Sequence, residues 1–383
     1  MDGEQPCEPP GRSRKSLVRV SVVSRTRLLD ARLSEPARSL SRGPAPDPGQ
    51  HHTRTPRPDG GRRSARGYLW TVSSAELAPV PTSPAWYAKV GRFRRWTRPV
   101  LVANLVGQIG IIVTGGAVRL TGSGLGCSTW PLCEPGSFTP EFHSAMSIHP
   151  IIEFGNRTLT GVLGIIAVAL LLLVWTDASR SSSYRRLGWA PLGGVAAQAV
   201  IGGITVLLHL HPAVVGFHFL VSAALVWVSA YLLYRHGEGD KAPVAVVDAG
   251  TRVVGRVLAA VSVPLLVLGV LATGSGPHGG DDEVAYRFAL DPALVSKLHA
   301  ASVWLFLIVL VVLAVRVLRQ ADAPARARKA VVVLVAVTLL QGLIGYVQYF
   351  TGLPEILVAA HMLGAGLLIT SLTWTLLSFR VRD

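Results

Sequence analysis

The sequence predicts an all-α integral membrane protein with eight transmembrane helices, built as two parallel-repeat four-helix bundles and preceded by a disordered tail. Three observations lead to this fold class. Of the 383 residues, 50% are hydrophobic and only 15% are charged, and the mean hydropathy is +0.43. From Pro99 onward, apolar stretches long enough to cross a bilayer alternate with short polar loops. Several motifs of the first half also recur, in the same order, in the second half of the chain.

The tail covers residues 1–98. It is rich in Arg, Pro, Ser and Gly, and it contains 19 of the 37 Lys and Arg residues but only 8 of the 22 acidic residues. Such a composition cannot bury enough apolar surface to offset the entropy lost on folding, so we expect it to be disordered. The other basic residues lie mostly in short loops, where they orient membrane proteins. Nucleic acid is therefore not an expected partner.

Eight apolar stretches follow the tail, four in an N-terminal half (residues 99–236) and four in a C-terminal half (residues 251–380). The loops at 176–187 and 316–329 are basic, whereas the loops on the opposite side are acidic. By the positive-inside rule, both termini are cytoplasmic in a multi-pass protein of the plasma membrane. The expected spans are 100–119, 150–175, 188–208, 213–234, 255–274, 294–315, 329–350 and 355–378.

The two halves repeat one another. The segment VRLTGSG at 118–124 resembles VLATGSG at 270–276, and QAVIGG at 198–203 resembles QGLIGY at 341–346. Each half contains an even number of spans, so both copies have the same orientation in the membrane. This is a parallel repeat, unlike the inverted repeats of many transporters.

Three histidines occupy equivalent depths in these spans. His218 and His361 lie 143 residues apart, and the same offset relates Asn156 to His299. Ionisable groups inside a membrane are costly and usually face the bundle interior, where they have a function. An interhelical hydrogen bond is the alternative. Two neutral imidazoles inside a bundle can bind a haem iron from both sides, so we predict that His299 and His361 are axial haem ligands.

The N-terminal half has an incomplete set of ligands, because Asn156 carries an amide and His218 is the one strong ligand there. Glu153 lies one turn before Asn156, and its repeat counterpart is Ser296. A carboxylate that is present only in this half indicates a catalytic role. The alternative role for Glu153 is an ion pair with a nearby arginine, either Arg157 or Arg119.

The loop after the first span adds two further candidates. Cys127 and Cys133 flank a short segment, and such a pair is a disulfide candidate where the loop faces an oxidising compartment; free thiols are the alternative. His149 lies two turns before Asn156 and is a candidate surrogate ligand, although the following Pro150 favours a loop position.

At these residues the chain resembles the bacterial haem A synthase family, membrane oxidoreductases that oxidise haem O to haem A for terminal oxidases. The resemblance covers about residues 99–380. It rests on six motifs in a fixed order: VRLTGSGLGC…WPLC, HPIIEFGNR, GFH at 216–218, TGSGPHGG at 273–280, KLHAAS at 297–302 and AAHMLGA at 359–365.

The resemblance implies a haem b in the C-terminal half and the substrate haem O, or the product haem A, in the N-terminal half. The reaction it implies converts the methyl group at ring position 8 to a formyl group through a hydroxymethyl intermediate. The implied site residues are the haem b ligands His299 and His361, the substrate-haem ligand His218, the catalytic carboxylate Glu153, and the disulfide of Cys127 and Cys133. The chain departs from the family at Asn156, where well-known members have a fourth histidine. This departure argues against bis-histidine ligation of the substrate haem, but not against activity.

The partners implied are haem O and the haem O synthase that supplies it, the lipid membrane, and an electron donor that the sequence does not identify. A homo-oligomer is compatible with the sequence. Two other functions compete with this one. A b-type cytochrome that only relays electrons predicts two histidine ligands in each half and haems near both faces, whereas the candidate ligands here all lie towards the outer ends. In a catalytically degenerate haem-binding paralogue, Asn156 would mark lost activity, but retention of Glu153 argues against this function.

Overall fold

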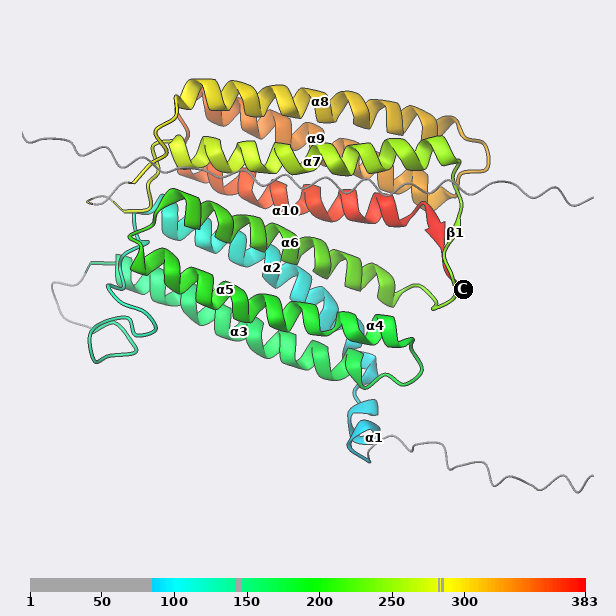
Figure 1. Ribbon diagram of the computed structural model, residues 1–383, viewed down its shortest axis with the longest axis horizontal. Coiled ribbons are helices and arrows are strands. Elements are labelled where there is room, and N and C mark those ends of the chain that lie inside the picture. The colour runs from blue at the N-terminus through cyan, green and yellow to red at the C-terminus, as the bar shows by residue number, and fades with distance from the viewer. Residues whose placement is uncertain (1–84, 142–146, 282, 284–285) are drawn as a thin grey trace, which may run out of the picture. The chain divides into compact units, whose positions relative to one another are not determined.

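The computed structural model describes residues 85–141, 147–281, 283 and 286–383, and long helices dominate them (Figure 1). Eight of these helices are long and apolar enough to cross a membrane, which confirms the predicted fold class. The predicted disorder of residues 1–84 concerns a segment outside this description. The helices are α2 (Thr97–Leu120), α3 (His149–Trp175), α5 (Trp189–Leu207) with the short α4 (Ser182–Leu187) before it, α6 (Pro212–His236), α7 (Ala249–Ser275), α8 (Pro292–Arg319), α9 (Ala325–Phe350) and α10 (Glu355–Leu377).

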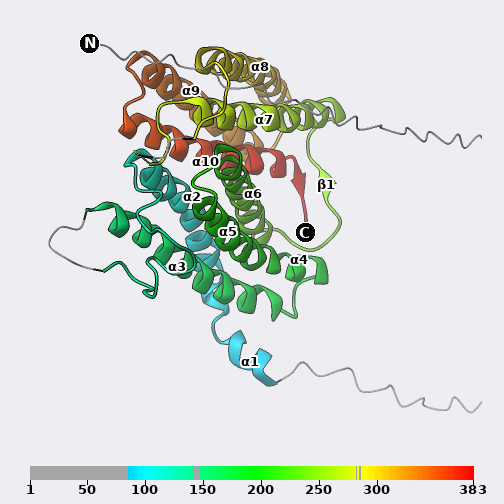
Figure 2. The same cartoon turned by 60° about the vertical axis from the view of Figure 1, so that its left-hand side comes forward.

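The long helices form two groups of four. In the N-terminal half, α2, α3, α5 and α6 contact one another around a closed ring, and α7, α8, α9 and α10 do the same in the C-terminal half. Helix α10 packs against α2 and α6 and joins the two groups (Figures 1 and 2). The loops after α2 and α7 lie together, because Gly124 N donates a hydrogen bond to Gly280 O at 2.8 Å. The two halves therefore run in the same direction, as the parallel repeat predicts.

We call the end of the helices that carries the loop 121–148 the disulfide end, and the opposite end the terminal end. Between them, the C-terminal half packs around an apolar core in which Phe306, Leu310, Leu313 and Val317 recur at helical spacing along α8. All four are fully buried. Large apolar side chains elsewhere point outward, as expected for helices that face lipid; examples are Ile165, Phe350 and Ile356.

The last residues of the predicted disordered tail are helical instead. Helix α1 covers Ala85–Gly91, and a short 3₁₀ helix, η1, covers Arg94–Trp96 directly before α2. Arg94 accounts for this order, because its guanidinium donates to Leu173 O and to Thr176 Oγ1. These acceptors lie at the end of α3, where the last helix carbonyls lack partners within the helix.

At the terminal end, hydrogen bonds to the carboxylate of Asp240 join the loop after α6 to the loop after α3. Asp240, which follows α6, accepts a hydrogen bond from Arg180 Nε at 2.9 Å and another from Ser181 N at 2.8 Å. Just beyond it, the two-residue strands β1 (Val244–Ala245) and β2 (Arg380–Val381) pair in antiparallel fashion. Burial alone would raise the pKa of Asp240, but the hydrogen bonds from Arg180 and Ser181 outweigh burial and lower its pKa to about 2.

Replacement of Asp240 by asparagine is expected to lower the free energy of unfolding by about 1 kcal/mol at neutral pH. The folded-state pKa of Asp240 lies below the unfolded value of about 3.9. The contribution of the Asp240 carboxylate to the free energy of unfolding is therefore fully present above about pH 4 and is lost as the pH falls through about 2. Thermal melting of the detergent-solubilised protein between pH 7 and pH 2 measures it. Asp322→Asn at the same end is the control. A difference in melting temperature between the wild type and Asp240→Asn that stays constant across this pH range would contradict the prediction.

Candidate functional site

Four polar residues lie at one depth near the disulfide end. Asn156 in α3, His218 in α6, His299 in α8 and His361 in α10 each follow the first residue of their helix by six or seven positions. All four helices begin at the disulfide end, so a rise of 1.5 Å per residue places these side chains roughly 10 Å inside it. The repeat relation seen in the sequence is thus preserved in space.

The two histidines of the C-terminal half are neighbours. The ring centroids of His299 and His361 are 6.5 Å apart, and the ring planes meet at 79°. Bonds between a metal and an imidazole nitrogen are about 2 Å long, so one ion shared by two imidazoles separates their ring centres by roughly 6 Å. The observed spacing fits one metal ion between the two rings.

A hydrogen bond fixes the proton on one of these imidazoles. His299 Nδ1 lies 3.2 Å from Leu265 O, a carbonyl that can only accept, so Nδ1 carries the proton and Nε2 is free to bind a metal. His218, in the N-terminal half, has a buried Nδ1 that has no hydrogen-bond partner among the described residues.

A glutamine supports the helix backbone at two of the four positions. Gln198 Nε2 donates to His218 O at 3.0 Å, and Gln341 Nε2 donates to His361 O at 2.8 Å. The constant spacing of 20 residues between these glutamines and histidines in the sequence therefore reflects one repeated interhelical contact.

Each of the four positions also faces a glycine on the adjacent helix. A Cβ atom added to that glycine would lie 3.2 to 3.9 Å from the facing side chain, which is tight against His299 and His361 and ordinary van der Waals contact at the other two positions. The facing pairs are Gly202–His218 (3.4 Å), Gly269–His299 (3.2 Å), Gly345–His361 (3.2 Å) and Gly115–Asn156 (3.9 Å). This shared arrangement makes Asn156 the structural counterpart of the three histidines.

Hydrogen bonds within the N-terminal half hold both Asn156 and His149. Thr114 Oγ1 of α2 donates to Asn156 Oδ1 at 2.8 Å. His149 is the first residue of α3, so it lies in the helix and not in the preceding loop as expected. Its Nδ1 is 2.8 Å from Ser123 Oγ. Proline is well tolerated in the first turn of a helix, which explains why Pro150 does not exclude His149 from α3.

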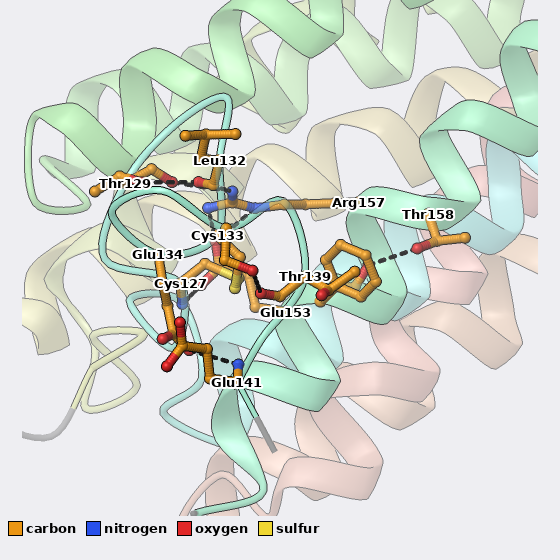
Figure 3. The surroundings of a disulfide bond; sticks show 12 residues. Cys127, Thr129, Leu132, Cys133, Glu134, Thr139, Glu141, Glu153, Arg157 and Thr158 are labelled. Carbon is orange, nitrogen blue, oxygen red and sulfur yellow. Dashed lines mark hydrogen bonds and ion pairs between the residues drawn. A yellow bond between two sulfur atoms is a disulfide. The ribbon is translucent and has the colours of Figure 1, made fainter. Parts of the chain in front are cut away.

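Glu153 is buried, with 5% of its surface exposed, and both carboxylate oxygens accept hydrogen bonds. Cys127 N donates to Oε2 at 2.7 Å, and Arg157 donates to Oε1 from Nε at 3.0 Å and from Nη2 at 2.5 Å (Figure 3). The ion pair considered from the sequence thus forms with Arg157. Arg119 donates instead to backbone carbonyls of the C-terminal half.

This carboxylate–guanidinium pair is specific to the N-terminal half. The repeat offset relates Glu153 to Ser296 and Arg157 to Ala300, neither of which can form an ion pair. The two halves therefore share the helices and the depth of the site but differ in the charges beside it.

The disulfide loop is anchored on α3. Cys127 and Cys133 form the predicted disulfide, and both are fully buried. Arg157 Nη1 donates to Thr129 O at 3.0 Å and to Leu132 O at 3.1 Å, two carbonyls between the cysteines (Figure 3). Arg157 therefore holds the loop and the carboxylate of α3 together.

Replacement of both Cys127 and Cys133 by serine is expected to lower the free energy of unfolding by about 2 kcal/mol, the chain-entropy value for so short a loop. Thermal melting in detergent measures the loss, and wild-type protein treated with a reductant should melt like the variant. Cys7→Ser in the tail is the matched control. A double-serine variant that melts at the wild-type temperature would contradict the prediction.

The sequence reasoning did not assign Thr114 or the facing glycines to the site. Two of the glycines carried a signal, since Gly202 and Gly345 hold the same place in the repeated segments QAVIGG and QGLIGY. Thr114 carried no such signal in the sequence, because one hydroxyl among apolar residues does not reveal which helix it faces.

These features define a class of protein: a multi-pass membrane protein of two repeated four-helix halves with imidazoles near one end of the bundle. The sequence profile of a family described as cytochrome oxidase assembly protein (COX15-CtaA) matches residues 98–373. The chain belongs to this family, and its resemblance to the haem A synthases is confirmed.

Similar proteins include the heme A synthases of Bacillus cereus (strain AH187) and Bacillus anthracis (strain A0248). Each is 34% identical to this chain over 149 residues. The matched segment is 38% of this chain, and it spans about half the length of these relatives, 45% of each.

Proposed function

We propose that the protein is an oxidoreductase that converts a methyl group of haem O to a formyl group and so forms haem A. One observation carries the proposal: two sites of equal depth differ in their chemistry. The C-terminal site contains two imidazoles, whereas the N-terminal site contains the imidazole of His218 and, one turn from Asn156, the carboxylate of Glu153. A simple electron carrier has no need of this difference. An enzyme with a resident cofactor in one half and a substrate in the other does need it.

A resident haem b in the C-terminal half is supported by the His299–His361 spacing of 6.5 Å. The porphyrin supplies four ligands to a haem iron, which therefore needs only one or two from the protein. Among the described residues, no group of three or more His, Cys, Asp or Glu side chains could hold a metal ion. A pair of imidazoles suits haem better than it suits zinc, which takes three or four protein ligands. When bound, this haem would supply one-electron transfer.

In the N-terminal half, His218 would bind the iron of the substrate and Glu153 would act beside the reacting methyl group. Oxidation of a methyl group releases protons and develops positive charge at carbon. A carboxylate can accept the protons or stabilise the positive charge. Arg157 and the Cys127 amide support this role, because they hold the carboxylate of Glu153 in one orientation.

The charges of the loops support an orientation with both termini in the cytoplasm. The basic loop 176–187 lies at the terminal end, and the disulfide lies at the other end, which would face the oxidising side of the plasma membrane. Haem O, an apolar substrate, would reach the site through the membrane from the haem O synthase that makes it.

Expression in cells that make haem O but not haem A tests the proposal, with extraction and chromatography of the membrane haems. The expected result is haem A or its hydroxymethyl precursor, and the same cells producing His218→Ala serve as the control. Accumulation of unconverted haem O with only haem b bound to the protein would contradict the proposed reaction.

A further inference from the structure

Asn156 takes the place of a fourth histidine, and its amide is arranged to donate a hydrogen bond, not to bind a metal. Thr114 Oγ1 donates to Asn156 Oδ1 at 2.8 Å. That oxygen is the only acceptor of the side chain, and the amide nitrogen carries two hydrogens and can only donate. The one atom of this side chain that could bind iron therefore already accepts a hydrogen bond from Thr114.

The amide nitrogen faces a glycine of the adjacent helix, as the imidazole of His299 does in the other half. Asn156 Nδ2 is 3.9 Å from the Cβ position of Gly115, and His299 Cε1 is 3.2 Å from that of Gly269. The path from Cβ to Nδ2 in asparagine is one bond shorter than the path from Cβ to Nε2 in histidine. The donor thus occupies the same region but ends short of a ligand's reach.

Neighbouring side chains of α3 do not replace the missing imidazole. His149 is hydrogen-bonded to Ser123, and Glu153 is engaged by Arg157 and by the Cys127 amide. The partners of both groups belong to α3 or to the loop that contains the disulfide.

We propose that the protein binds the substrate iron on one side only, through His218, and that Asn156 donates a hydrogen bond over the open side. A small diatomic molecule such as O₂ or CO binds there. Thr114 is a positioning residue that fixes the direction of the Asn156 amide. The inference rests on the proposed function, since it requires a haem in the N-terminal half.

Carbon monoxide is the probe for this open side. Full-length protein is purified with its haems, reduced with dithionite and titrated with CO. We expect one of two haems per chain to bind CO, because the haem between His299 and His361 has no free position. Asn156→His should lower the CO-binding fraction at least tenfold, and the new imidazole would face Gly115 as the three histidines face their glycines.

The vibrational spectrum of bound CO tests the hydrogen bond itself. Asn156→Leu should retain CO binding but raise the C–O stretching frequency, because the donor is lost. Thr114→Val should shift the frequency in the same direction by less. Thr158→Val in α3 is the matched control, since the exposed Thr158 hydroxyl donates to Phe154 O of its own helix.

The possible results separate this inference from the function on which it rests. Two haems per chain with no CO binding in the wild type would overturn the open side and leave the proposed reaction standing. An unchanged stretching frequency in Asn156→Leu would overturn the donor role. A chain that holds haem b alone would overturn the inference together with the proposed substrate site.

Discussion

Replacement of Glu153 by glutamine is expected to lower the rate of haem A formation at least 100-fold, the usual effect of losing a general acid–base group. Glutamine has nearly the same shape and can still accept from Cys127 N, but it carries no charge and cannot take up a proton. Haem content and melting temperature should change far less than the rate, because the iron ligands that we propose are other residues. Rates are measured as haem A per unit of protein in membranes.

Two further variants separate the charge of Glu153 from its position. Glu134→Gln removes a carboxylate from the same loop region and should leave the rate unchanged, because Glu134 accepts from Glu141 N of that loop and not from Arg157 (Figure 3). Arg157→Lys keeps the positive charge but loses the two-point contact with the carboxylate, so an intermediate rate is expected. A normal rate of haem A formation in Glu153→Gln would remove this residue from the reaction.

The membrane helices could be predicted from the sequence because their length and composition are set by the bilayer. About 20 apolar residues are needed to span it, and the eight predicted spans coincide with eight helices. The largest difference is at α7, which begins at Ala249, six residues before the predicted start. Polar and basic residues can extend a helix beyond the hydrocarbon layer, so hydropathy does not mark where it ends.

The parallel repeat and the disulfide were also predictable, since both depend on spacing along the chain. Partners across helices were harder to predict, because they depend on the rotation of each helix about its axis and on side-chain rotamers. The choice of Arg157 over Arg119 for Glu153 is one example. The hydrogen bond from Thr114 to Asn156 is another. Helix α1 was missed because it packs against the distant helix α3, to whose end Arg94 is also hydrogen-bonded.

Replacement of His361 by alanine is expected to abolish the low-spin haem b spectrum and to lower the haem content of the purified protein by about half. An iron with two imidazole ligands is six-coordinate and low-spin, and alanine would remove one of the two ligands that we propose for that half. His299→Ala should give the same loss of spectrum, because the 6.5 Å between the two rings fits a single shared iron. Absorption and electron paramagnetic resonance spectra measure the coordination.

His278→Ala is the matched control for both variants, because His278 lies at the same end but is hydrogen-bonded to Leu353 O. It should retain the low-spin signal. Added imidazole should restore that signal to His361→Ala, since a free ligand can enter the space left by the side chain, whereas an unfolded variant would not recover. If His361→Ala keeps a low-spin spectrum without added imidazole, the second ligand of the C-terminal site must be another residue. The repeat relation between His218 and His361 would then describe the helices and not their chemistry.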